Sequence, residues 1–212
     1  MRKILFVSAT LLLGAAAMMA FVMPSQKTPA TKSTANLIET GKWSVDKAHS
    51  SVKFTVTHLV VSEVEGSFKL FDGSMENGKA DLSDAKISFK VDVNSIDTDN
   101  ERRDGHLKSD DFFNAEKYPS MTFTSTSVTP AGGNKYKLAG NLTIRDVTKP
   151  VVFDVTYGGS AAANTKLGFK AQTTINRFDY NLKWDKATES GGLVVSKEVL
   201  ITVNAQLNKV KE

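Results

Sequence analysis

The sequence contains no cysteine, and this absence excludes several kinds of chemistry at once. There is no disulfide framework, no thiol nucleophile, no Cys-ligated zinc or iron–sulfur site, and no lipid attachment through an N-terminal cysteine. Export is not excluded, because a chain of 212 residues can bury a sufficient core without covalent cross-links. The length favours a single domain.

Histidine is scarce, with three in the whole chain. His49 and His58 are nine positions apart and would face opposite sides of one regular strand. Three scattered histidines without a cysteine are a weak metal signal, so we predict no metal site. The motifs G-x-S-x-G and H-E-x-x-H are also absent. We therefore expect no catalytic residues, no enzyme activity and no cofactor other than a bound lipid or isoprenoid.

Excess positive charge is small. The formal net charge is +4, and Arg2 and Lys3 in the N-terminal segment account for two of these charges. No block of lysine or arginine stands out elsewhere. A nucleic-acid-binding protein normally carries a basic patch or stripe, so we expect no nucleic-acid partner.

The N-terminal segment is typical of a targeting sequence. Arg2 and Lys3 precede the apolar run Ile4–Leu13 and the small residues Gly14–Ala17, which together predict a signal peptide over residues 1–20. The alternative is an uncleaved membrane anchor, because the 20 residues of Ile4–Met23 carry no charge. Either way, we expect a periplasmic, secreted or membrane-anchored protein.

After this segment, the composition changes twice. Residues 21–40 are rich in Thr, Ser, Ala, Lys and Pro without apolar periodicity, which predicts a flexible linker. Residues 41–212 show no internal linker and no convincing repeat, so we predict one domain there.

Apolar and polar residues alternate along most of this domain. The clearest segments are 52–56, 86–93, 136–144, 166–175 and 199–207. A period of two marks strands with one apolar face and one wet face. Gly-containing turn signals occur at Asp72-Gly73, Asn77-Gly78, Gly132-Gly133-Asn134, Gly158-Gly159 and Gly191-Gly192. We predict an all-β fold, an antiparallel up-and-down barrel of about eight strands, because closure buries the apolar face and removes sheet edges.

Residues 97–119 break the alternation and are dense in charge. Asp99 or Asn100 is a suitable N-cap, so we predict a short helical excursion near residues 100–113. Leu107, Phe112 and Phe113 give it an apolar side. An excursion of this length often has a function, and we expect it to cover one end of the barrel.

Five segments in order resemble the YceI-like family of exported lipid-binding proteins: Trp43–Leu59, Glu65–Phe68, Ser95–Phe123, Gly140–Val151 and Thr174–Tyr180. The resemblance implies a lipocalin-like barrel with an elongated apolar cavity that binds a polyisoprenoid or similar long-chain lipid. Two features depart from the family pattern. Asp146 stands where a turn glycine is expected, and the segment Tyr180–Leu193 is longer and more charged than expected.

The apolar face of each predicted strand supplies the candidate ligand-binding residues. From pattern alone, a cavity and a side-chain-filled core are equally open; the resemblance favours a cavity. The candidates are Phe54, Val56, Phe68, Leu70, Phe89, Val91, Phe123, Leu138, Leu142, Phe153, Val155, Phe169 and Ile175.

Candidate contacts to a polar head group are His58, Arg102, Asp104 and His106. Arginine suits bidentate contact with phosphate. The alternative is a solvated helix whose internal Arg–Asp pairs hold the excursion in place.

The leading hypothesis is a non-enzymatic carrier that binds a polyisoprenoid, an isoprenoid quinone or a fatty-acid derivative for transport, storage or sequestration in the cell envelope. We expect a monomer or homodimer that makes transient membrane contact. The alternative is an envelope stress or structural protein with a packed barrel that binds a protein partner through its surface. A third hypothesis, an enzyme, needs a pairing such as His58 with an inward carboxylate.

Overall fold

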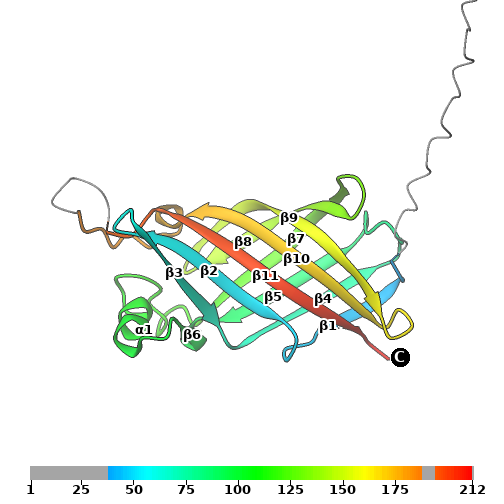
Figure 1. The fold of residues 1–212 in the computed structure, drawn as a ribbon, viewed down its shortest axis with the longest axis horizontal. Coiled ribbons are helices and arrows are strands. Elements are labelled where there is room, and N and C mark those ends of the chain that lie inside the picture. The colour runs from blue at the N-terminus through cyan, green and yellow to red at the C-terminus, as the bar shows by residue number, and fades with distance from the viewer. Residues whose placement is uncertain (1–37, 188–193, 212) are drawn as a thin grey trace, which may run out of the picture. The chain divides into compact units, whose positions relative to one another are not determined.

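The computed structural model describes residues 38–187 and 194–211 (Figure 1). The predicted signal peptide, linker residues 21–37 and Gly191-Gly192 lie outside these residues. Ile38 is fully buried, its amide donates to the carbonyl of Ala80, and Glu39 accepts an ion pair from Lys209 at 3.0 Å. The packed barrel therefore includes Ile38, three residues before the boundary expected at residue 41.

Strands dominate the described residues, as the alternation predicted. They are β1 (Gly41–Val45), β2 (Ser51–His58), β3 (Ser62–Phe68), β4 (Phe71–Asn77), β5 (Lys86–Asp92), β6 (Ile96–Asp97), β7 (Ser120–Pro130), β8 (Lys135–Ile144), β9 (Val147–Ala161), β10 (Lys166–Asn176) and β11 (Glu198–Lys209). The helical elements are α1 (Glu101–Lys108) and the short 3₁₀ helices η1 (Val93–Ser95) and η2 (Arg177–Tyr180).

The strands close into an antiparallel barrel. Eight strands form the ring in the order β1-β4-β5-β7-β8-β9-β10-β11, and β1 pairs with β11 to complete it. The remaining three strands extend this ring. Strand β11 pairs with β1 near one end and with β2 near the other, β2 pairs in turn with β3, and β3 pairs with β6. Each long strand thus lies beside the next one in sequence. This confirms the predicted up-and-down barrel of about eight strands.

Two of the predicted turns are wrong. Asp72-Gly73 lies inside β4, and Gly158-Gly159 lies inside β9. At the first, the ring of Phe89 on β5 lies 2.5 Å from where a Cβ of residue 73 would be, so close packing explains the glycine. At the second, Gly159 has φ +122° beside a register shift between β9 and β10. Gly132-Gly133-Asn134 does join β7 to β8.

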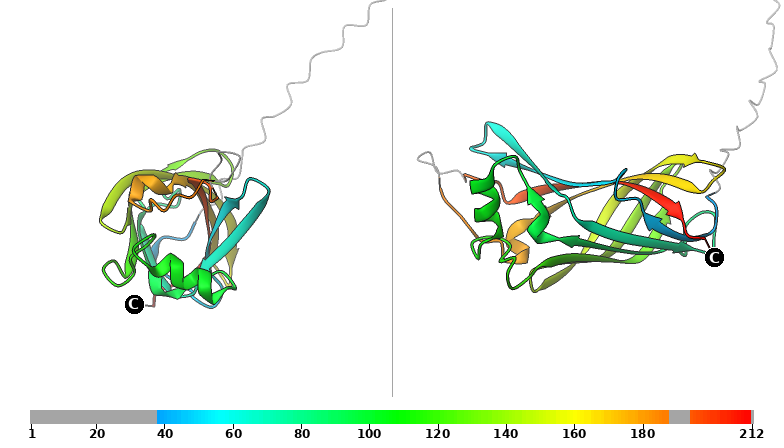
Figure 2. Two further views of the ribbon diagram at one scale, coloured as in Figure 1. Left: turned by 90° about the vertical axis from the view of Figure 1, so that its left-hand side faces the viewer. Right: turned by 90° about the horizontal axis from the view of Figure 1, so that it is seen from below.

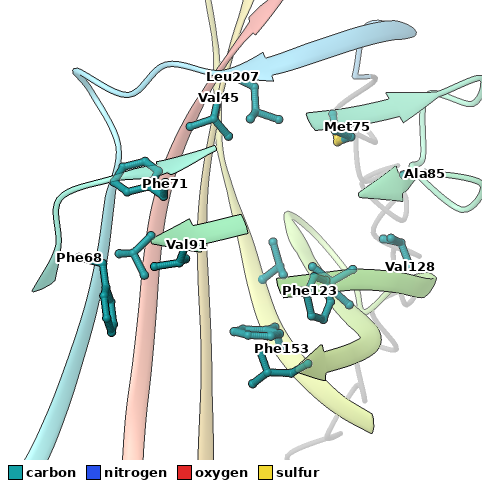
Figure 3. Packing of buried hydrophobic residues seen from close by; sticks show 14 of the residues in the cluster. Val45, Phe68, Phe71, Met75, Ala85, Val91, Phe123, Val128, Phe153 and Leu207 are labelled. Carbon is teal, nitrogen blue, oxygen red and sulfur yellow. The ribbon is translucent and has the colours of Figure 1, made fainter. Parts of the chain in front are cut away.

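The barrel has two distinct ends (Figure 2). One carries residues 38–40 and the connections 78–85, 131–134 and 162–165; we call it the packed end. The other carries the β2–β3 turn 59–61, the α1 excursion 98–119, the β8–β9 turn 145–146 and the described parts of 177–197; we call it the mouth end. Figure 3 shows buried side chains from several strands pointing into the barrel between these ends.

Side chains fill the packed end. Trp43, Ile38 and Leu167 are each 1% exposed. The indole N–H of Trp43 donates to the amide oxygen of Asn77 at 2.9 Å, and the Asn77 amide donates to the carbonyls of Glu39 and Lys79. The buried polar atoms of the Trp43 and Asn77 side chains are therefore paired, which offsets the cost of removing them from water.

The excursion at the mouth end contains a shorter helix than predicted. Asn100 is the N-cap, accepting from the amide of Arg103 at 3.0 Å, as expected. The helix ends at Lys108 and not near residue 113, because the amide and hydroxyl of Ser109 both turn back to the carbonyl of His106. Turns follow, and they place Phe112 in the core. Among the described residues, no helix has the length and apolar character needed to span a membrane.

Candidate ligand-binding cavity

A cavity of about 450 Å³ occupies the barrel interior. Twelve of the thirteen predicted interior residues line it: Phe54, Val56, Phe68, Phe89, Val91, Phe123, Leu138, Leu142, Phe153, Val155, Phe169 and Ile175. They come from seven strands, and most of the remaining lining residues are also apolar. The strand periodicity therefore identified inward-facing residues on seven strands of the barrel.

Leu70 is the exception, and its prediction as an interior residue is wrong. Its side chain is 60% exposed. It lies in the two-residue break between β3 and β4, where the period of two is lost, and Phe68 and Phe71 on either side are both buried. The break shifts the inward face from even-numbered to odd-numbered positions, so Leu70 points to solvent.

Glycines opposite aromatic rings help to keep the interior hollow. Phe54 and Phe89 lie directly opposite Gly66 and Gly73 on the neighbouring strands, and Gly140 lies on β8 two positions before Leu142, the partner of Phe123. A Cβ at Gly66 would lie 2.2 Å from the Phe54 ring, and one at Gly140 would lie 2.4 Å from the Phe123 ring. The rings therefore lie close against the wall over bare backbone. This arrangement leaves space along the barrel axis.

A further section of wall was not among the predicted site residues. Five apolar side chains on β10 and β11 also line the cavity: Ala171, Val199, Ile201, Val203 and Ala205. The alternation in segment 199–207 was the signal that could have found most of them. Ala205 lies directly opposite Phe169, so a small residue faces a large one.

Aromatic residues cover the mouth end of the cavity. Leu107, Phe112, Phe113 and Trp184 line it, as the apolar side of the excursion predicted for the first three. The rings of Phe112 and Trp184 are 5.4 Å apart, and the imidazole of His106 meets both edge-on. Trp184 belongs to the segment Tyr180–Leu193 that departs from the family pattern, so this segment contributes to the mouth.

The β8–β9 turn holds this cover in place. One guanidinium nitrogen of Arg145 donates to the carbonyls of Asp110, Phe112 and Asn181, and the other pairs with the Asp110 carboxylate at 3.0 Å. The carboxylate of Asp146 accepts a hydrogen bond from the Asn181 amide, which lowers the pKa of Asp146. The aspartate that replaces the expected glycine thus ties the turn to the chain after η2.

Of the four predicted head-group contacts, only two line the cavity. His58 extends the inward series of Phe54 and Val56, and His106 lies at the mouth. Arg102 is exposed and borders a shallow pocket together with Arg103 and His106, and Asp104 accepts hydrogen bonds from the amide and hydroxyl of Thr98. Neither Arg102 nor Asp104 is part of the cavity lining, so their contact with a head group stays a prediction. The helix start at Glu101 turns Arg103 and His106 inward instead.

Two arginines, Arg103 and Arg177, also line the cavity, and sequence reasoning missed Arg177. Arg177 follows Ile175 at a spacing of two, which was the available signal. It is 4% exposed, and its guanidinium donates to the carbonyls of Leu182, Trp184, Val195 and Ser196 at 2.7–3.1 Å. Burial lowers the pKa of Arg177. The side chain therefore holds both described flanks of the loop that leads to β11.

Acidic side chains do not contribute to the cavity wall within the described residues, since no Asp or Glu is among those that line it. The pairing of His58 with an inward carboxylate, which an enzyme would need, is thus not found in this part of the chain. No group of three or more His, Asp or Glu side chains suited to a metal ion occurs there either.

Comparison with known proteins gives consistent matches. A family model described as a YceI-like domain matches residues 43–207. A UPF0312 protein of Staphylococcus epidermidis is 35% identical over 171 residues, covering 79% of this chain and 97% of that protein. The crystal structure of BcnA from Burkholderia cenocepacia has a TM-score of 0.69 at 28% identity and covers 76% of this chain and 98% of that chain.

A more distant solved structure has the same fold. It is a polyisoprenoid binding domain from Saccharophagus degradans, with a TM-score of 0.64 at 16% identity, covering 81% of this chain and 100% of that one. At this identity, the likeness concerns the fold alone.

Proposed function

The chain belongs to the YceI-like domain family, and from this premise we propose that it is a non-enzymatic binding protein that holds one long apolar molecule inside its barrel. The observation that carries the proposal is the apolar cavity of about 450 Å³. Ligand pockets of 300–1,000 Å³ with mostly apolar walls are typical of small-molecule sites. The polyisoprenoid binding domain that shares this fold supports the same class of ligand.

The shape of the barrel favours an elongated ligand. Strands β10 and β11 contain 11 and 12 residues and run for roughly 35–40 Å, so the interior is much longer than it is wide. Each buried methylene contributes about 0.8 kcal/mol, partly offset by the ordering of a flexible tail. A polyisoprenoid, an isoprenoid quinone or a fatty-acid derivative has a long apolar tail that can bind in this cavity without specific hydrogen bonds along the tail.

We place this activity in the cell envelope. The charged and apolar pattern of residues 1–20 supports export, and a bound apolar tail in an aqueous compartment suits transport, storage or sequestration of a lipid. The protein would then act by non-covalent burial alone.

We propose that ligand exchange involves contact with a lipid surface, and the β2–β3 turn supports this proposal. Leu59, Val60 and Val61 are 45%, 74% and 84% exposed at the mouth end. Leu59 and Val60 adopt positive φ, which is especially costly for the β-branched Val60, although glycine or asparagine would relieve the strain. We propose that this turn inserts its apolar side chains into a bilayer when the barrel takes up or releases its ligand.

Native mass spectrometry tests the binding function. The full chain is expressed with its N-terminal segment, purified from the periplasm of a bacterial host without detergent, and measured before and after organic extraction. We expect an added mass of several hundred daltons that extraction removes. A clean apo mass, with no thermal shift on adding isoprenoids or fatty acids, would contradict the proposal and favour the alternative of a protein partner on the outer surface.

A further inference from the structure

The basic residues that line the cavity have no acidic carboxylate beside them in the lining. Within the described residues they are Lys53, His58, Arg103, His106 and Arg177, and the lining contains no Asp or Glu. Lys53 alternates with the inward residues of β2 and pairs with Glu65 on the outside, so it is set aside. The other four side chains are basic, and all lie at the mouth end.

Shared neighbours and helical spacing connect these four residues. His106 meets the ring of Trp184 at 5.4 Å, and the carbonyl of Trp184 accepts from Arg177 at 2.8 Å. His58 forms a β-bridge with Val195, whose carbonyl also accepts from Arg177. Arg103 lies one helical turn before His106 on the same face of α1. The four side chains therefore form a basic rim around one end of the apolar cavity.

Nearby carboxylates balance this rim only in part. Asp111 pairs with His106 at 2.8 Å. Asp104 reaches Arg103 only through the Thr98 hydroxyl, which donates to Asp104 and accepts from Arg103. Among the described residues, no Asp or Glu lies within 4 Å of the guanidinium nitrogens of Arg103 or Arg177. Both arginines thus carry positive charge at the cavity wall without a direct counter-ion there.

Hydrogen-bonding capacity also remains on the rim. Arg103 donates through Nε and Nη2 to Thr98, which leaves its Nη1 without a partner among the described residues. Arg177 donates to four carbonyls, and a guanidinium has five N–H donors. Hydrogen bonds between an ionised donor and an ionised acceptor are the strong ones, and guanidinium matches the geometry of carboxylate and phosphate.

We propose that the ligand has an anionic head group, a carboxylate or a phosphate, which lies at the mouth end against Arg103, Arg177 and His58 while its tail fills the cavity. This inference rests on the proposed function and adds the chemical class of the head. A cationic head is disfavoured by repulsion at the same rim.

Tail-matched ligands test the head group directly. Purified, delipidated protein is loaded with the neutral dye Nile red, which oleic acid, oleyl phosphate, oleyl alcohol and oleylamine then displace at concentrations below micelle formation. We expect an anionic ligand to bind about tenfold more tightly than the alcohol, because charge-assisted hydrogen bonds are stronger than neutral ones. We expect oleylamine to bind most weakly. The better of the two anions identifies the head as carboxylate or phosphate.

A matched pair of variants assigns the effect to the rim. Substituting Arg177 would also release four backbone carbonyls, so Arg103 is the position to change. Arg103→Gln should remove most of the anion preference while oleyl alcohol binds within about twofold of the parent protein. Arg102→Gln makes the same change of charge at the neighbouring residue, which does not line the apolar cavity, and should keep the preference.

The outcomes separate the two proposals. Equal binding of the alcohol and both anions, or strongest binding of the amine, overturns the anionic head and leaves the tail-binding function standing. An equal loss of preference in Arg102→Gln and Arg103→Gln overturns the placement at the rim, because it reports net charge alone. Displacement by none of the four ligands removes the proposed function and this inference together.

Discussion

At the packed end of the barrel, Trp43 and its neighbours fill the interior and pair every buried polar atom of the Trp43–Asn77 contact. Along the cavity, Phe54, Phe89 and Phe169 are only partly buried, because their inner faces border it. Both regions use large apolar side chains of one barrel. What differs is whether the side chains meet one another across the axis or lie flat against the wall.

Small residues at defined positions produce this difference. Gly66 and Gly73 let the rings of Phe54 and Phe89 approach the wall, and Ala205 leaves room opposite Phe169. At the packed end, Trp43 is joined by Ile38 and Leu167, which close the barrel. Stability and ligand capacity are therefore expected to reside in different parts of one continuous sheet.

Truncation at each end should give the largest contrast. Trp43→Ala removes a fully packed side chain and leaves the Asn77 amide oxygen without its donor, so we expect a loss of about 3–5 kcal/mol in the free energy of unfolding. Phe54→Ala removes a ring that already borders empty space and should cost less than half as much. Urea denaturation followed by circular dichroism measures both. Equal losses would contradict the division into a packed and a hollow region.

Adding volume should likewise cost more stability at the packed end than beside the cavity. Ala85, 6% exposed and near Met75 (Figure 3), lies outside the cavity lining, whereas Ala171 faces the cavity. Ala85→Leu should destabilise by about 1–3 kcal/mol through overpacking. Ala171→Leu should be neutral or stabilising by up to about 1 kcal/mol, as cavity-filling changes often are.

Ligand affinity gives the second readout for this pair. Leucine at position 171 takes space from the tail, so displacement of Nile red by oleic acid should need about tenfold more ligand. Ala85→Leu should leave the affinity of the folded protein unchanged. Destabilisation by Ala171→Leu similar to that of Ala85→Leu would indicate that the interior is filled by side chains.

Most of the fold was predictable because it depends on a local pattern. The period of two along 52–56, 136–144 and 166–175 predicts which side chains point inward wherever a strand is regular. It fails at Leu70, because the break between β3 and β4 changes the inward face. The turn at Asp72-Gly73 fails for a related reason: the role of Gly73 depends on Phe89, a residue on another strand.

The mouth end was less predictable because its geometry depends on contacts between distant segments. Arg145 joins the α1 excursion to the chain after η2, and Arg177 holds the described flanks of the last connection. No local period encodes such contacts. The choice between Arg102 and Arg103 as the inward residue depends on the rotation of α1 against the barrel, which the N-cap alone does not set.

The smallest effect on stability, and the most specific effect on function, is expected at the β2–β3 turn. Val60 and Val61 are exposed at the mouth end, and Val210 is 46% exposed at the packed end. Val60→Asp with Val61→Asp, and Val210→Asp as the matched control, should each change the free energy of unfolding by about 0.5 kcal/mol or less, because the side chains face solvent. If the turn enters a bilayer, charges on it must be desolvated during each exchange, and charges at the packed end need not be.

Transfer of a fluorescent fatty acid between vesicles should therefore slow several-fold in the turn variant and stay unchanged in Val210→Asp. Affinity for oleic acid in solution serves as the check that the cavity is intact, and it should stay the same in both. Similar transfer rates in the two variants would mean that ligand enters without contact between this turn and the membrane. The mouth end would then differ from the packed end only in holding the ligand, and not in how the barrel meets its lipid source.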